Sequence, residues 1–185
     1  MKNNITTCML YGRFIQTTGN FPGPKVIKPK GEKTKMEAIQ FQRPETVDEA
    51  VKLLQNAEGD ARILAGGTDL LVQLRAHMID PGVIIDIKSI EETRTLTKNG
   101  DGSYTIGSAV AGAEAHERDD ITADWPGVVE AWDLIGSTQI QGRASLGGNL
   151  CNASPAGDSV PAMVAAGMTA NIAGPDGRRS IPVEE

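Results

Sequence analysis

The sequence predicts an α+β fold in which a small parallel βαβ unit precedes a mixed subdomain of strands and helices. From residue 36 to residue 89, short β-capable segments alternate with apolar residues at helical spacing, a pattern typical of parallel strands joined by crossover helices. From residue 90 the strands are separated by turns and mixed with amphipathic helices. We therefore expect subdomains at residues 36–89 and 90–185, after a flexible extension over residues 1–35.

The first subdomain contains three expected strands, at residues 38–41, 61–64 and 83–87. Thr46 and Glu49 have the spacing of a capping box, which predicts that a helix begins beside Thr46. A second helix should follow the second strand. Its apolar face is traced by Leu70, Leu71, Leu74 and Met78.

The second subdomain is predicted from turn signals and helix ends. A turn at residues 99–102 precedes an alternating strand at 103–106, and residues 127–135 form an amphipathic helix. A further helix should start at Asp158 or Ser159 and end before Gly167. The final stretch, residues 169–183, is predicted to be a β-hairpin.

Composition excludes several classes of protein. The formal net charge of -6 argues against nucleic-acid binding, which needs clustered cations. No apolar run approaches the length of a membrane span. The two cysteines, Cys8 and Cys151, are too far apart in sequence to suggest a thiolate-held cluster. The first residues lack the pattern of a signal peptide, and we expect a reducing, cytoplasmic setting.

The first candidate site is the loop Ala65-Gly66-Gly67-Thr68-Asp69, between an expected strand and an expected helix. Glycines let the backbone approach a ligand closely, and a helix start offers free amides to an anion. Thr68 and Arg62 are possible further donors to a phosphate, while Asp69 should turn away and cap the next helix. The alternative is an ordinary tight turn that needs glycine.

The second candidate site is the stretch from Arg143 to Pro155, which contains Ser145-Leu146-Gly147-Gly148-Asn149. Its small and amide-bearing residues suit a phosphate or polyol ligand, and Asp158 would accept hydrogen bonds from ribose or ribityl hydroxyls. The alternatives are an N-cap role for Asp158 and turn-forming roles for Asn149 and Asn152. Cys151 is expected to be a small buried residue.

At these residues the chain resembles the FAD-binding, or medium, subunit of molybdenum hydroxylases such as aerobic carbon monoxide dehydrogenase and bacterial xanthine dehydrogenase. The likeness spans residues 36–185. It rests on the two Gly-Gly loops, on Ile106-Gly107-Ser108-Ala109-Val110, and on Ile135-Gly136-Ser137-Thr138-Gln139-Ile140. It continues through Asn152-Ala153-Ser154-Pro155-Ala156-Gly157-Asp158.

The resemblance implies a vanillyl-alcohol-oxidase-type (PCMH-type) fold that binds FAD non-covalently around its pyrophosphate. The cofactor-binding residues expected are Arg62, Leu64, Ala65, Gly66, Gly67, Thr68, Asp69, Leu70, Ser145, Leu146, Gly147, Gly148, Asn149, Ala153, Ser154 and Asp158. No catalytic or metal-binding residue is expected in this chain. Members of the family continue into a C-terminal domain, which we expect to be missing here.

The resemblance further implies an oxidoreductase subunit of a hetero-oligomer. Such a subunit passes electrons through FAD to an external acceptor, and its partners are an iron-sulfur subunit with [2Fe-2S] clusters and a large molybdopterin subunit. The alternative is a truncated docking module for the iron-sulfur subunit that holds little flavin. A stand-alone flavin oxidase is disfavoured, because no residue suggests covalent flavin attachment or a substrate-side base.

Overall fold

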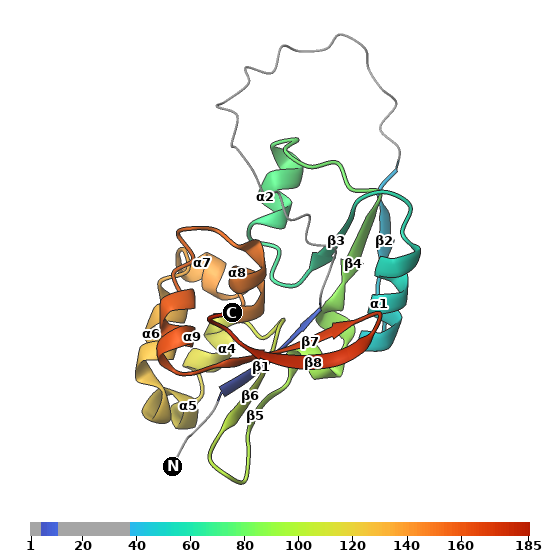
Figure 1. The fold of residues 1–185 in the computed structure, drawn as a ribbon. Coiled ribbons are helices and arrows are strands. Elements are labelled where there is room, and N and C mark those ends of the chain that lie inside the picture. The colour runs from blue at the N-terminus through green and yellow to red at the C-terminus, as the bar shows by residue number, and fades with distance from the viewer. Residues whose placement is uncertain (1–4, 11–37) are drawn as a thin grey trace.

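The computed structural model describes residues 5–10 and 38–185 (Figure 1). Its strands form a three-stranded and a five-stranded sheet, which confirms the α+β class. Within the described residues, no helix is long and apolar enough to span a bilayer.

The three-stranded sheet is entirely parallel. Its strands are β2 (Gln40–Gln42), β3 (Ala61–Leu64) and β4 (Val83–Asp86), with β4 in the centre. Helix α1 (Val47–Asn56) connects β2 to β3, and α2 (Leu70–Arg75) connects β3 to β4. The predicted parallel unit is therefore present. Because Leu64 pairs with Asp86 in register, the loops that follow β3 and β4 leave the sheet at the same edge.

Helix α1 begins as predicted, with a difference in the cap. The Thr46 side chain accepts a hydrogen bond from the Glu49 N–H at 3.2 Å. The Glu49 carboxylate accepts from the N–H of Glu45 at 2.9 Å, one residue before the position that a capping box requires. The helix then buries Val47 and Ala50 against the sheet.

The five-stranded sheet is mixed, as predicted for the second subdomain. Two antiparallel pairs, β5 (Leu96–Lys98) with β6 (Tyr104–Gly107) and β7 (Thr169–Gly174) with β8 (Gly177–Pro182), form its two sides. Strand β1 (Ile5–Leu10) lies between β6 and β7 and is parallel to both.

Strand β1 corrects part of the predicted flexible extension. Residues 5–10 are β-capable, but their strand partners lie near residues 104–107 and 169–173. Local periodicity carries no signal for pairing over such a distance, so sequence patterning missed this strand. The other residues of the predicted extension, 1–4 and 11–35, lie outside the described residues.

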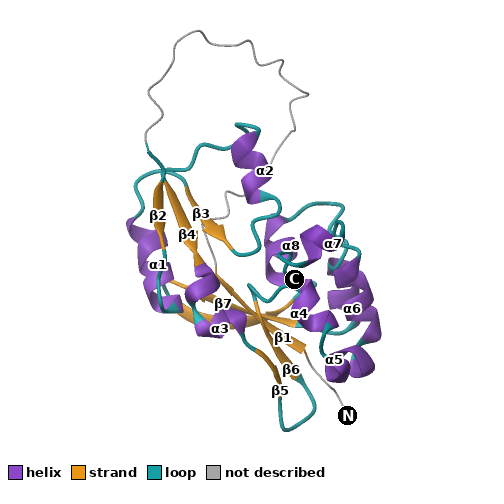
Figure 2. Cartoon of the chain, turned by 180° about the vertical axis from the view of Figure 1, so that it is seen from behind, coloured by secondary structure: helices purple, strands orange, loops and turns teal. Residues whose placement is uncertain are grey.

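Short helices make up most of the second unit, and Figures 1 and 2 show α4 to α9 gathered on the side of the molecule opposite β2 and α1. A 3₁₀ turn, η1 (Ile87–Ser89), follows β4. The helices after it are α3 (Glu91–Arg94), α4 (Gly112–His116), α5 (Asp119–Asp124), α6 (Pro126–Asp133), α7 (Thr138–Gln141), α8 (Leu146–Asn152) and α9 (Val160–Ala165).

Helix α2 is shorter and more exposed than its sequence predicts. It ends at Arg75, and His77 adopts a left-handed backbone with φ of 52°. The N–H of Met78 then bonds to the carbonyl of Gln73 at 2.9 Å, a hydrogen bond typical of a Schellman ending. Leu71 and Met78, expected on a buried face, are 50% and 71% exposed.

Two apolar clusters form the core. The larger packs Tyr104 and Ile106 of β6 against Trp132 of α6 and Met163 of α9. The smaller packs α1 and β4 together with Ala109, which follows β6, and Ala173 of β7. Because this second cluster draws on both sheets, the two units are joined by a shared apolar contact.

Candidate functional site

The two Gly-Gly loops meet in space. A Cβ placed on Gly66 would lie 2.1 Å from the carbonyl oxygen of Arg143, far inside van der Waals contact. The backbone of the first loop thus lies directly against the residue that leads into the second loop. This contact between the two loops requires glycine at residue 66. From the sequence, the glycine was expected there because it lets the backbone approach a ligand.

The first loop presents free amides. Gly67 has a left-handed backbone with φ of +83°, a conformation that side-chain-bearing residues rarely adopt. Among the described residues, the N–H groups of Gly66 and Gly67 donate no hydrogen bond, whereas the carbonyl of Gly67 accepts from the N–H of Leu71 at 3.0 Å. Two adjacent unpaired donors at a turn are suited to bind an anion.

Lys88, in the 3₁₀ turn η1 that follows the neighbouring strand β4, supports this loop. Its Nζ donates to the carbonyl oxygen of Ala65 at 3.2 Å and to the Asp86 carboxylate at 2.6 Å. Asp86 is 6% exposed, and Arg43 lies 3.9 Å from its second oxygen. Sequence reasoning missed Lys88. The available signal was an Asp-x-Lys sequence that begins at the last residue of a buried parallel strand.

The second loop forms the start of α8. The hydroxyl oxygen of Ser145 accepts from the N–H of Gly148 at 3.1 Å and caps the helix, so this residue has a structural role. A Cβ on Gly147 would lie 2.6 Å from the Cβ of Ser108. Only glycine allows Ser108 to pack this closely against the first turn of α8.

Ser108 is the second residue that sequence reasoning did not place in the site. It is 4% exposed, and its hydroxyl has no hydrogen-bond partner within the described residues. A buried hydroxyl without a partner costs free energy unless another group satisfies it. Its position beside Gly147 fits a site that receives a polar ligand. The sequence signal was its place in the Gly107-Ser108-Ala109 segment of the resemblance.

The approach to the second loop is fixed by two hydrogen bonds to one carbonyl. The oxygen of Ala144 accepts from the N–H of Gly112 at 2.9 Å and from the indole Nε1 of Trp132 at 3.1 Å. Trp132 is fully buried. The start of α8 is thereby anchored to α4 and α6 at the point where the first loop contacts it.

Two polar residues behind the second loop differ in their surroundings: Asn149 is hydrogen-bonded to the start of the next helix, and Asp158 is exposed. Asn149 accepts a hydrogen bond from the Ser159 hydroxyl at 2.8 Å and so ties α8 to the start of α9. Asp158 is exposed and does not cap α9, whose N-cap residue is Ser159. The carboxylate of Asp158 therefore remains available to a ligand.

Several predicted site residues are engaged elsewhere or differ in detail. Arg62 donates to Asp60 at 2.9 Å, toward the start of β3 and away from the loop at its end. Asp69 precedes α2 but makes no capping hydrogen bond, because its own backbone is already helical. Ser154 is exposed and accepts from the N–H of Ala156 at 3.3 Å. Cys151, expected to be buried, is exposed.

The remaining predicted residues frame the loops. Leu64 and Leu146 are buried beneath them, and Ala153 ends α8 with φ of 51°. Ala65, Thr68 and Leu70 are half-buried in the first loop and at the start of α2.

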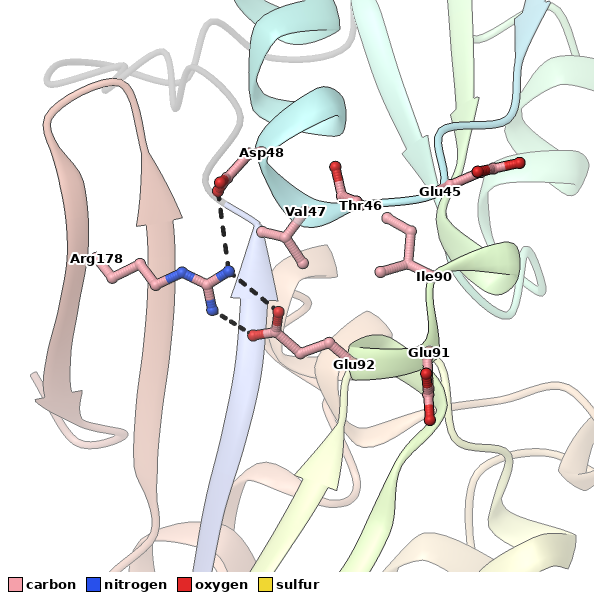
Figure 3. Close-up of a pocket in the computed structure, with 8 residues that line it drawn as sticks. All are labelled: Glu45, Thr46, Val47, Asp48, Ile90, Glu91, Glu92 and Arg178. Carbon is pink, nitrogen blue, oxygen red and sulfur yellow. Dashed lines mark hydrogen bonds and ion pairs between the residues drawn. The ribbon is translucent and has the colours of Figure 1, made fainter.

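A separate pocket of about 280 Å³ lies away from the loops and is shown in Figure 3. Arg178 of β8 points into it and pairs with Glu92 of α3 and Asp48 of α1. Glu45 and Glu91 add two more carboxylates to its lining. This excess of negative charge opposes a phosphate ligand. In the described residues, no His, Cys, Asp and Glu side chains cluster as a metal site would require.

Comparison with known proteins gives the architecture a family. Residues 36–185 match the family described as the FAD binding domain in molybdopterin dehydrogenase. The chain is 30% identical over 146 residues to the carbon monoxide dehydrogenase medium chain of Hydrogenophaga pseudoflava, covering 79% of this chain and 50% of that one. It is 34% identical over 143 residues to the xanthine dehydrogenase FAD-binding subunit of Escherichia coli O157:H7, covering 77% and 49%.

Solved structures agree with these relatives. Carbon monoxide dehydrogenase from Hydrogenophaga pseudoflava superposes with a TM-score of 0.75 at 30% identity, covering 80% of this chain and 51% of that one. Quinoline 2-oxidoreductase from Pseudomonas putida 86 superposes with a TM-score of 0.71 at 25% identity, covering 80% and 52%. The chain thus spans about half the length of the relatives it matches. It belongs to the family of FAD-binding domains of molybdopterin dehydrogenases.

Proposed function

We propose that this chain binds FAD non-covalently, with the pyrophosphate at the junction of the two Gly-Gly loops. The observation that carries the proposal is the pair of N–H groups on Gly66 and Gly67, which have no partner within the described residues, with Gly66 packed against Arg143 at the entry to the second loop. A pyrophosphate would supply the acceptors that these donors lack.

Other residues of the site would complete the contacts. The start of α8 adds the N–H groups of its first turn, including that of Gly147, and the Ser108 hydroxyl would gain a partner beside it. The exposed carboxylate of Asp158 would accept hydrogen bonds from ribose or ribityl hydroxyls. Because backbone amides supply most donors, the site needs little formal positive charge.

The relatives support a role in electron transfer. When bound, FAD supplies the capacity to accept and pass on electrons, and the protein orients it and controls access to it. We propose that the chain serves as the flavin part of a molybdopterin-dependent oxidoreductase. Its partners would be an iron-sulfur subunit that delivers electrons and a molybdopterin subunit where the substrate reacts.

A flavin titration tests the binding proposal. The purified full chain should quench the fluorescence of added FAD with a saturable curve, and adenosine diphosphate, which carries the pyrophosphate without the flavin, should compete. Riboflavin, which lacks phosphate, should bind more weakly than FAD. Failure to bind FAD, both alone and together with the partner subunits, would reject the proposed function.

A further inference from the structure

Lys88 contacts the first Gly-Gly loop at the carbonyl oxygen of Ala65, and this contact determines where the next amide points. The peptide unit between Ala65 and Gly66 is planar and trans, so its C=O and N–H point in opposite directions. The ammonium of Lys88 holds the Ala65 oxygen at 3.2 Å. The N–H of Gly66 is therefore turned away from Lys88 and has no partner in the described chain.

The position of Lys88 is itself fixed. Its Nζ lies 2.6 Å from Asp86 Oδ1, and the same carboxylate oxygen accepts the backbone N–H of Lys88 at 3.0 Å. Asp86 is buried at the end of the central strand β4. The 21% exposure of the Lys88 side chain limits the competition from water. The end of β4 thus holds the Lys88 ammonium in the position from which it bonds to the first loop.

We infer that Lys88 is a positioning residue, which aims the Gly66 amide at the pyrophosphate by holding the Ala65 carbonyl. The inference rests on the proposed function and adds a residue to it. Asp86 orients Lys88 and balances its charge. Because the pair carries no net charge, it affects binding mainly by setting the direction of the Gly66 N–H.

Three variants of the full chain test this role. Lys88→Met removes the donor and keeps a long side chain, Lys88→Arg keeps a charged donor, and Lys52→Met is the control on the exposed face of α1. Hydrogen bonds to charged groups are worth enough that Lys88→Met should raise the Kd for FAD by about tenfold. Lys88→Arg should recover most of the affinity, and Lys52→Met should match the parent chain.

Two readouts separate positioning from a general structural role. The affinity for riboflavin, which has no pyrophosphate, should change little in Lys88→Met. In the protein without flavin, the amide NMR signal of Gly66 should shift and its hydrogen exchange should change in Lys88→Met, but not in Lys52→Met. An unchanged Kd for FAD, or an equal loss of riboflavin affinity, would overturn the inference.

The amide readout also distinguishes this inference from the proposed function. If the parent chain binds no FAD, the proposed function fails and the pyrophosphate role of Lys88 fails with it. A Gly66 signal that still responds to Lys88→Met would then show that the contact orients the loop for some other purpose. If FAD binds and the Gly66 signal does not respond, only the role of Lys88 is rejected.

Discussion

Gly66 shows how one missing side chain allows the site to form. Replacing it by alanine would place a methyl group 2.1 Å from the Arg143 carbonyl oxygen, which is backbone and cannot rotate away. We expect Gly66→Ala to separate the loops, to lower stability by about 1–3 kcal/mol and to abolish FAD binding. Calorimetry and flavin titration measure the two effects.

Gly142 provides the control for that substitution. It precedes Arg143, and a Cβ on it would meet nothing within 4 Å. Gly142→Ala should therefore retain both stability and FAD affinity. If the two variants behave alike, close contact between the loops is not what requires glycine at residue 66.

Individual residues also show the limits of sequence reading at the site. The Gly-Gly loops are recognisable because two adjacent glycines after a strand indicate either a tight turn or a close approach of the backbone to another group. Lys88 and Ser108 were missed because their roles depend on neighbours that lie about 20–40 residues away in sequence, Ala65 and Gly147. Arg62 was placed in the site by its nearness in sequence, although it pairs with Asp60.

Helix α6 contains Trp132 and begins after Trp125, and it anchors the second loop through the indole of Trp132. Trp132 Nε1 donates to the Ala144 carbonyl, whereas Trp125 Nε1 is buried and has no partner in the described part of the chain. Trp132→Phe should lower the free energy of unfolding through loss of this hydrogen bond, worth about 1 kcal/mol, and should weaken FAD binding.

Trp125→Phe is the matched variant, because it removes a buried donor that bonds to none of the described residues. Its hydrogen-bonding cost should be near zero, so it should destabilise the protein less than Trp132→Phe and leave FAD affinity intact. Urea unfolding of both variants makes the comparison. Equal losses would show that packing, and not the bond to Ala144, determines the effect of Trp132.

Helix α5 carries an acidic pair that should make stability depend on pH. A hydrogen bond from Arg118 lowers the pKa of Asp120 to about 2, and hydrogen bonds from Lys98 and Tyr104 lower the pKa of Asp124 below its usual 3.8. A lowered folded-state pKa means that the unfolded state takes up protons first as the pH falls. The stabilisation is therefore complete above about pH 5 and is lost toward about pH 2.

Unfolding in urea across that range tests the acidic pair. The free energy of unfolding should decline as the pH falls, and Asp120→Asn, which cannot ionise, should make the decline shallower. An identical pH dependence in the variant and the parent chain would show that the pairing of Asp120 with Arg118 contributes nothing.

Elements were predictable where local signals bracket them. Strand β3 has its predicted bounds because Gly59 and Asp60 precede it and the Gly-Gly loop follows it. Helix α2 was predicted too long, since its apolar spacing continues to Met78, past the left-handed turn at His77. Short helices such as α7, with four residues, have too few turns to show a period.

At the scale of the whole molecule, β1 holds the five-stranded sheet together. Thr7 pairs with Ile106 of β6 and with Ala170 of β7. A proline in a central strand removes a ladder hydrogen bond and restricts the backbone. Thr7→Pro should therefore lower the free energy of unfolding by about 1–3 kcal/mol, the cost of leaving its ladder partner unsatisfied, as measured by urea unfolding.

Thr7→Val keeps the backbone N–H and a β-branched side chain, so it should unfold close to the parent chain. If the proline variant is as stable as the valine variant, β1 does not contribute to the sheet. The sequence could not predict this strand, since its pairing joins residues about 100 or more positions apart.

Amide NMR during an FAD titration tests most directly whether the pyrophosphate binds where the two Gly-Gly loops meet. The amide signals of Gly66, Gly67, Gly147 and Gly148 should show saturable shifts, with little change at Glu92 and Arg178 in the acidic pocket. Binding that leaves the glycine signals unchanged, or that shifts the acidic pocket instead, would contradict this placement of the pyrophosphate.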